Sequence, residues 1–175
     1  MRLHCLVALL LAGCTAVDPV TALRLSTVDP LTADPAGYAV ALDLPAGLDI
    51  RPDSAFLTLR ATRADTGETA ERAFALIAGD VDTYALDRAD LPRFRALQSR
   101  IKAWQAAAPE ATSGSLSVAV GGCRRGLGPA ADARVGVRLR TRPGDAFLPL
   151  LRDAPLDRLL GAAAGRGLPA CDGPI

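Results

Sequence analysis

The stretch LTLRATRADTGETAERAFALI, residues 57–77, decides the fold class of this chain. Over residues 57–62, Leu and Ala alternate with polar neighbours, so an extended strand here has one apolar face. The sequence Asp-Thr-Gly-Glu at residues 65–68 favours a turn. Residues 69–77 then return as the expected partner strand. The stretch predicts an antiparallel hairpin that is half buried.

Other segments repeat this period of two, and Gly- and Pro-containing turns separate them. The expected further strands lie at residues 23–27, 38–44, 81–86, 115–120 and 134–140. The glycine-rich loop over residues 121–129 is expected to join the last two as a hairpin. The pattern predicts a mainly β fold, and its closest architecture is an immunoglobulin-like antiparallel β-sandwich with one inserted amphipathic helix and a short C-terminal helix.

The inserted helix is expected from an apolar stripe with helical spacing. The stripe consists of Leu91, Phe94, Leu97, Ile101 and Trp104. Asp87 or Asp90 is expected to cap the helix, and Pro109 to close it. The stripe is read as packing against the sheet, and docking of a partner is the alternative. The short C-terminal helix is expected over residues 155–164, with Asp153 as its cap.

The N-terminus carries Leu11-Ala12-Gly13-Cys14 after the basic Arg2 and a short apolar run. An apolar run of about ten residues spans about 15 Å as a helix, too short to cross a bilayer but typical of a signal peptide. In this position the four residues resemble the lipobox of bacterial lipoproteins. The resemblance covers only the first fifteen residues or so. It implies that a diacylglycerol is attached to Cys14, that a peptidase cuts before it, and that the new amino group is acylated, for example with palmitate.

This resemblance sets the expected organisation and location. Residues 1–13 are expected to be a signal peptide, residues 14–22 the lipidated Cys and a tether, and residues 23–175 a single domain. The expected location is the bacterial cell envelope, anchored by lipid and facing the periplasm. Thr15, where an Asp would resemble an inner-membrane retention signal, favours the outer membrane. The alternative is an ordinary secretory signal with Cys14 as a plain thiol.

Composition excludes several kinds of chemistry. The only histidine is His4, inside the expected signal peptide, so the mature chain lacks His-based catalysis and His-ligated zinc. The formal net charge of +1 gives no global bias toward nucleic acid. Of the four cysteines, Cys123 and Cys171 remain once Cys5 and Cys14 are assigned to the N-terminus. An even pair in an oxidising compartment predicts a disulfide, with two separate thiols as the alternative.

Three local motifs are read as structural. Ser99 and Lys102 match Ser-x-x-Lys of penicillin-binding enzymes, but the chain has no Asn for the supporting Ser-Asp-Asn motif. The aspartates at 80, 82, 87 and 90 do not have the spacing of an EF-hand and suit turns and helix caps. The glycines over 121–128 do not have the ending of a phosphate-binding loop. No metal or cofactor is expected.

An arginine set is the main candidate site. The expected strand face consists of Arg134, Arg138, Arg140 and Arg142. Arginine forks bind phosphate and carboxylate in a bidentate way, so this face could bind lipid headgroups, acidic peptidoglycan stems or an acidic partner. The alternative is a solvated face, paired with carboxylates such as Glu68 or Glu71, that also protects a sheet edge.

These observations predict a non-enzymatic binding, accessory or scaffold component of a cell-envelope complex, held to the membrane through Cys14. Its expected contacts are the arginine face and the sheet edges, and the expected partner is an envelope protein. A small-ligand or glycan-binding module is the alternative, with a pocket lined by Tyr38, Tyr84 or Trp104. An enzyme that uses two carboxylates is a third reading, but nothing in the sequence sets such a pair apart.

Overall fold

A computed structural model describes residues 30–80, 82–160 and 167–171 of the chain. The strands are β1 (Ala39–Asp43), β2 (Leu48–Arg63), β3 (Thr69–Ala78), β4 (Thr83–Leu86), β5 (Thr112–Arg124), β6 (Arg134–Arg140) and β7 (Leu148–Pro155). The helices are α2 (Leu91–Ala107) and α3 (Leu156–Leu160), with 3-10 turns η1 (Pro35–Gly37), η2 (Arg88–Asp90) and η3 (Pro109–Ala111). The predicted mainly β character is confirmed. The predictions for residues 1–29, with Cys14 and the strand over 23–27, and for residues 161–164 of the C-terminal helix lie outside the described residues.

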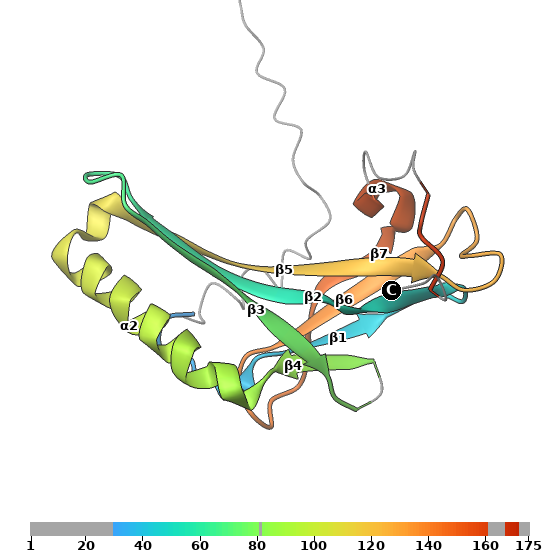
Figure 1. Cartoon of the computed structure of the whole chain (residues 1–175), viewed down its shortest axis with the longest axis horizontal. Helices are drawn as coiled ribbons and strands as arrows, with labels where there is room; N and C mark the ends of the chain where they lie inside the picture. The colour runs from blue at the N-terminus through green and yellow to red at the C-terminus, as the bar shows by residue number, and fades with distance from the viewer. Residues whose placement is uncertain (1–29, 81, 161–166, 172–175) are drawn as a thin grey trace, which may run out of the picture.

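The strands form one curled antiparallel sheet in the order β5-β2-β3-β4-β1-β6-β7 (Figure 1). Its two halves meet where β3 pairs with β4 over only three residue pairs, Leu76 with Leu86 through Ala78 with Tyr84. So short a junction lets the halves turn relative to one another. The immunoglobulin-like sandwich is therefore not confirmed, because one continuous sheet curls back on itself instead of two separate sheets stacking.

The hairpin predicted over residues 57–77 is confirmed, since Phe56 pairs with Ala75 and Thr62 with Thr69. The expected hairpin across residues 121–129 is wrong. β5 lies at one edge of the sheet, whereas β6 pairs with β1 and β7 in the other half. The first residues of the glycine-rich segment, 121–124, extend β5 as far as Arg124. The rest of the loop crosses to the half of the sheet that contains β6.

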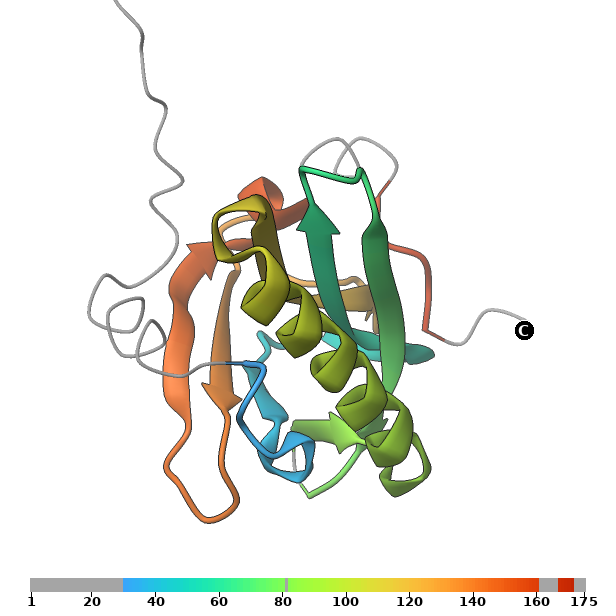
Figure 2. The same cartoon turned by 90° about the vertical axis from the view of Figure 1, so that its left-hand side faces the viewer.

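The core lies between the concave face of the sheet and α2, which runs diagonally across the front of the sheet in Figure 2. Phe94 and Ile101 of α2 are almost fully buried. The Phe94 ring lies 4.9 Å from that of Phe74 on β3 and 5.7 Å from that of Tyr38, measured between centroids. The predicted stripe thus packs against the sheet, with Leu91 and Leu97 only partly buried at its margin.

Sequence reasoning missed one buried polar residue of α2. Gln98 is 5% exposed, and its amide donates to the carbonyls of Pro30 at 2.8 Å and Ala33 at 2.9 Å. The Tyr38 hydroxyl donates to the same Pro30 carbonyl at 3.3 Å. These bonds fix the first described residues of the chain beside the helix. A polar residue within an apolar stripe is a signal that could have suggested such a role.

The helix ends partly follow expectation. Asp87 caps η2 by accepting from the Ala89 N–H, whereas Asp90 lies at the start of α2 without a capping bond and pairs with Arg93. α2 ends at Ala107, just before Pro109. The predicted cap at Asp153 is wrong, because this residue lies within β7 with a φ of 45°. In the described ranges, every helix is too short or too polar to cross a membrane.

Candidate functional site

A polar groove lies where β1, β6 and β7 come together. It has a volume of about 650 Å³. Its charged lining residues are Asp43, Asp82, Arg134, Arg138, Arg152 and Asp153. Three arginines and three aspartates therefore face one open cavity, and the groove offers charged hydrogen-bond donors and acceptors together.

The best-defined contact in this groove joins β6 to β1. Arg138 donates to Asp43 through Nη2 at 2.7 Å and Nε at 3.1 Å, a bidentate pair. Gly136 lies opposite Asp43 in the register, and a Cβ on it would come within 2.7 Å of the Asp43 Oδ2. The glycine thus leaves the room that the carboxylate needs to reach Arg138. Both side chains are about half exposed, so the pair contributes little to stability but orients the guanidinium.

Phe147, in the loop before β7, lies close to two arginines of β6. The guanidinium carbon of Arg140 is 5.0 Å from the ring centroid, and that of Arg138 is 6.0 Å away. Both distances are in the range of cation–π attraction. The Nε of Arg140 is buried without a hydrogen-bond partner among the described residues. The ring therefore organises the end of the arginine set nearest to the 141–147 loop.

The structure does not gather all four arginines in a line. Arg134 and Arg138 line the polar groove, and Arg140 turns to Phe147. β6 ends at Arg140, so Arg142 lies beyond the strand and is exposed. Sequence reasoning assumed a regular strand, whereas the pairing of β6 with β7 shifts register twice between Val135 and Arg138.

The carboxylates suggested for the arginines also differ from those observed. Glu68 and Glu71 approach Arg63 and Arg60 instead, within the β2–β3 hairpin. Sequence reasoning missed Arg152 and Asp153 as groove residues. They lie within β7, and nothing in the local sequence pattern indicated that this strand pairs beside β6.

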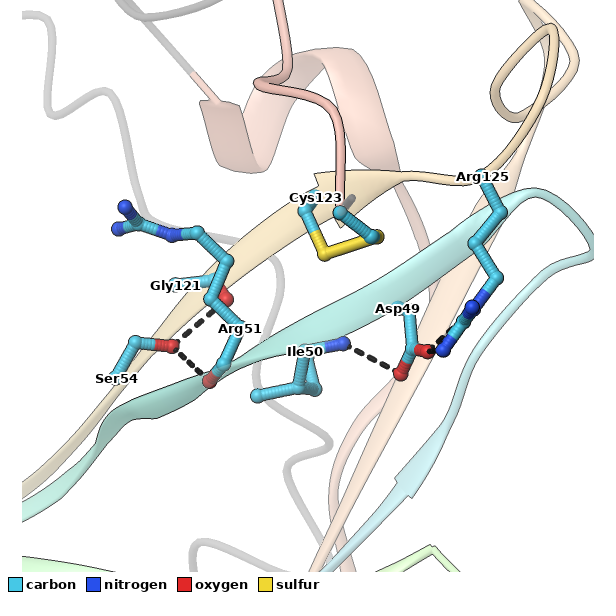
Figure 3. Close-up of a disulfide and its surroundings, with 8 residues drawn as sticks. Asp49, Ile50, Arg51, Ser54, Gly121, Cys123 and Arg125 are labelled. Carbon is cyan, nitrogen blue, oxygen red and sulfur yellow. Dashed lines mark hydrogen bonds and ion pairs between the residues drawn. A yellow bond between two sulfur atoms is a disulfide. The ribbon is translucent and has the colours of Figure 1, made fainter. Parts of the chain in front are cut away.

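The C-terminal end of β5 carries Cys123, one member of the cysteine pair predicted from the sequence. Cys123 and Cys171 lie at disulfide-bonding distance, with their Cα atoms 4.9 Å apart (Figure 3). Beside them, the Asp49 carboxylate accepts from the Ile50 N–H at 2.7 Å and from the Arg125 Nε at 2.6 Å. These bonds, the Ile50 N–H first, lower the pKa of Asp49 below its usual value, and partial burial opposes the shift.

A second groove is apolar and lies inside the curl of the sheet, with a volume of about 310 Å³. Both edge strands line it, Leu116, Val118 and Val120 from β5 and Leu150 and Leu151 from β7. Leu57, Val137, Leu139 and Tyr38 also contribute. The sequence did not predict this hydrophobic wall, because the wall forms only when the curl of the sheet brings the edge strands β5 and β7 to the same cavity.

The aromatic residues suggested for a ligand pocket lie in different places. Tyr38 lines the apolar groove with its buried ring, and Trp104 lies in the core beneath Arg100, whose guanidinium carbon is 4.8 Å from the ring centroid. Tyr84 lies on β4 opposite Val40. Burial is the first cause of a raised pKa for Tyr84, with Asp49 and Asp82 adding to it.

Within residues 30–80, 82–160 and 167–171, no group of three or more His, Cys, Asp or Glu side chains is arranged to hold a metal ion. The chain matches no protein-family model, no curated protein and no solved structure.

Proposed function

We propose that this chain is a lipid-anchored cell-envelope protein that binds a partner protein without catalysing a reaction. The single observation that supports this best is the polar groove between β1, β6 and β7, which presents Arg134, Arg138 and Arg152 together. The lipobox-like Leu11-Ala12-Gly13-Cys14 supports the anchor and the envelope location.

The groove suits a carboxylate-bearing surface that also carries a basic group. Arg138 is already oriented by Asp43, so binding of an acidic side chain would require little further ordering of its guanidinium. Arg134 is exposed at the start of β6 and adds a second guanidinium. Asp82 and Asp153 would accept from a basic residue of the same partner. Such mixed charges favour a specific protein over a uniformly anionic surface such as a lipid headgroup layer.

A photo-crosslinking experiment in intact cells tests this proposal. A crosslinkable amino acid replaces Pro149, which lines the groove, and the crosslinked proteins are identified by mass spectrometry. The same experiment is then run with Arg134→Glu and Arg138→Glu together. Arg88→Glu is the matched control, because Arg88 is exposed and lies outside the groove lining.

We expect one abundant crosslinked protein whose yield falls at least about tenfold in the double variant, since opposing like charges cost several kcal/mol at a complementary interface. The yield should be unchanged in Arg88→Glu. Equal yields in all three proteins would contradict the role of the groove. Loss of the crosslink in Arg88→Glu as well would show a general charge effect and would also contradict it.

A further inference from the structure

Before Arg124, the outer edge of β5 has none of the charged residues or prolines that usually protect the edge strand of a sheet. β5 is the first strand in the sheet order and pairs with β2 alone. Residues 112–123 contain neither a charged residue nor a proline. Natural edge strands are normally protected by charges, prolines or bulges, because an open row of N–H and C=O groups pairs with other chains. β7, at the opposite edge, carries such protection, with Pro149, Arg152 and Asp153, whereas a register shift occurs in the pairing of both edge strands.

The chain itself already uses the last part of this edge. The Arg124 N–H donates to the Pro169 carbonyl at 2.8 Å, and the Cys171 N–H donates to the Arg124 carbonyl at 3.0 Å. These bonds make a parallel bridge between Arg124 and Ala170. The backbone groups of Arg124 therefore point away from β2. Among the described residues, this bridge is the one pairing on that edge, and it leaves residues 112–121 uncovered.

The direction of the remaining backbone groups follows from this bridge. The Gly121 carbonyl points toward β2, since it accepts from the Ser54 hydroxyl at 2.9 Å (Figure 3). Backbone groups alternate in direction along a strand, so those of Leu116, Val118 and Val120 point outward like those of Arg124. The same three residues place their side chains along the apolar groove.

The chemistry of the groove restricts what can fill it. All twelve of its lining residues are uncharged, and the adjoining β5 edge is uncharged too. A charged side chain would lose its hydration there without gaining a partner. A hydrocarbon chain would match the wall but would leave the outward N–H and C=O groups of β5 unpaired. An extended segment of protein with apolar residues at alternate positions satisfies both the backbone edge and the wall.

We propose that the outer edge of β5 binds an extended, uncharged strand from a partner protein, whose alternate apolar side chains enter the groove beside Leu116, Val118 and Val120. The strand adds to the sheet by backbone hydrogen bonds, with its polar alternate residues facing outward. Five residues from Leu116 to Val120 extend over about 17 Å, so about five residues of the partner strand pair with them. This site on β5 does not involve the arginines of the polar groove, although Leu151 lines both grooves, and it does not depend on the lipid anchor or on the partner proposed above.

The test uses the chain without residues 1–14 and a fluorescent peptide as the probe. The probe alternates Thr and Val over seven residues and ends in Gly-Lys-Lys for solubility. Two further versions of the peptide carry N-methyl groups on every second backbone amide. One is methylated at the odd-numbered positions and the other at the even-numbered positions. Because only one set of amides faces β5, we expect one version to lose at least about tenfold in affinity and the other to bind like the parent, by fluorescence anisotropy. Amide hydrogen exchange should slow within residues 112–121 when the parent peptide binds.

Two variants test the wall. Val118→Asp places a charge in the groove and should weaken binding by at least about tenfold. Ala73→Asp is the matched control, because Ala73 is exposed on the inner strand β3, and it should bind normally. Circular dichroism confirms that both variants are folded. If Val118→Asp does not fold, the comparison of the two N-methylated peptides in the unchanged protein still decides the question.

Several results would overturn the proposal. Equal affinities for the two N-methylated peptides would show that backbone pairing is not involved, and a hydrocarbon ligand would become the better occupant. Tighter peptide binding after Leu23→Asp and Leu25→Asp would show that the chain's own N-terminal segment occupies the edge. A concentration-dependent doubling of mass that the peptide reverses would show that a second copy occupies it.

Discussion

Reduction of the Cys123–Cys171 pair should destabilise the protein by about 4 kcal/mol. The two residues are 48 positions apart in the chain. In the chain-entropy model, opening a loop of about this length restores unfolded-state freedom worth about 4 kcal/mol. The native state should survive, because the two backbone bonds between Arg124 and residues 169–171 still hold the tail against β5.

The assay is urea denaturation of oxidised and reduced protein, followed by circular dichroism. With a slope of about 2 kcal/mol/M, the midpoint should fall by about 2 M on reduction. Cys171→Ser should match the reduced protein. The argument fails if the two midpoints coincide, or if mass spectrometry of the unreduced protein finds both thiols free.

Four other changes give distinct results. Cys14→Ala should release the protein from the membrane fraction, because a single residue carries the proposed acyl chains, and persistent membrane association would contradict the anchor. Gln98→Ala should cost about 1–3 kcal/mol in urea unfolding, since the partly buried Ala33 carbonyl loses its side-chain donor and the Pro30 carbonyl keeps only the Tyr38 hydroxyl, whereas the exposed Gln105→Ala should cost less than about 0.5 kcal/mol. Gly136→Ala should weaken crosslinking through the polar groove without unfolding the chain, because its methyl group displaces the carboxylate that orients the groove arginine; unchanged crosslinking would refute that role. Asp49→Asn should destabilise the protein more at about pH 7 than at about pH 2. The folded-state pKa of this carboxyl is lowered, so its contribution is complete above the unfolded value of 3.8 and is lost as the pH falls through the lowered pKa. An equal loss at both pH values would contradict the charge-based explanation.

The local elements were predictable because their signals are local. The alternation over residues 57–77 determined a hairpin, and the stripe from Leu91 to Trp104 determined which face of α2 is buried. Neither inference needed to know which distant segment lies alongside.

The sheet order was not predictable, because any half-buried strand with the right alternation can pair with any other. β5 and β6 are consecutive in sequence, yet they lie in opposite halves of the sheet. For the same reason the polar groove was only half anticipated. Arg134 and Arg138 could be named from a strand pattern, but Asp43 and Arg152 join them only through the pairing of β1 and β7 with β6, and Asp82 only through the turn before β4 that lies beside β1. The apolar groove needed the curl of the sheet as well.

The bonds from Gln98 and Tyr38 to the start of the described chain have a mechanical consequence. If the chain is held by its N-terminus, a force acting on its described part enters at Pro30, the first described residue. The load then passes sideways into α2, which is seated on the sheet through Phe94 and Ile101, before it can act on β1. β1 is a short central strand paired on both sides, and removing it would detach β6 and β7 from β4 and the rest of the sheet. The hydrogen bonds from Gln98 to Pro30 and Ala33 would therefore carry part of the force and protect β1 from being pulled out of the sheet.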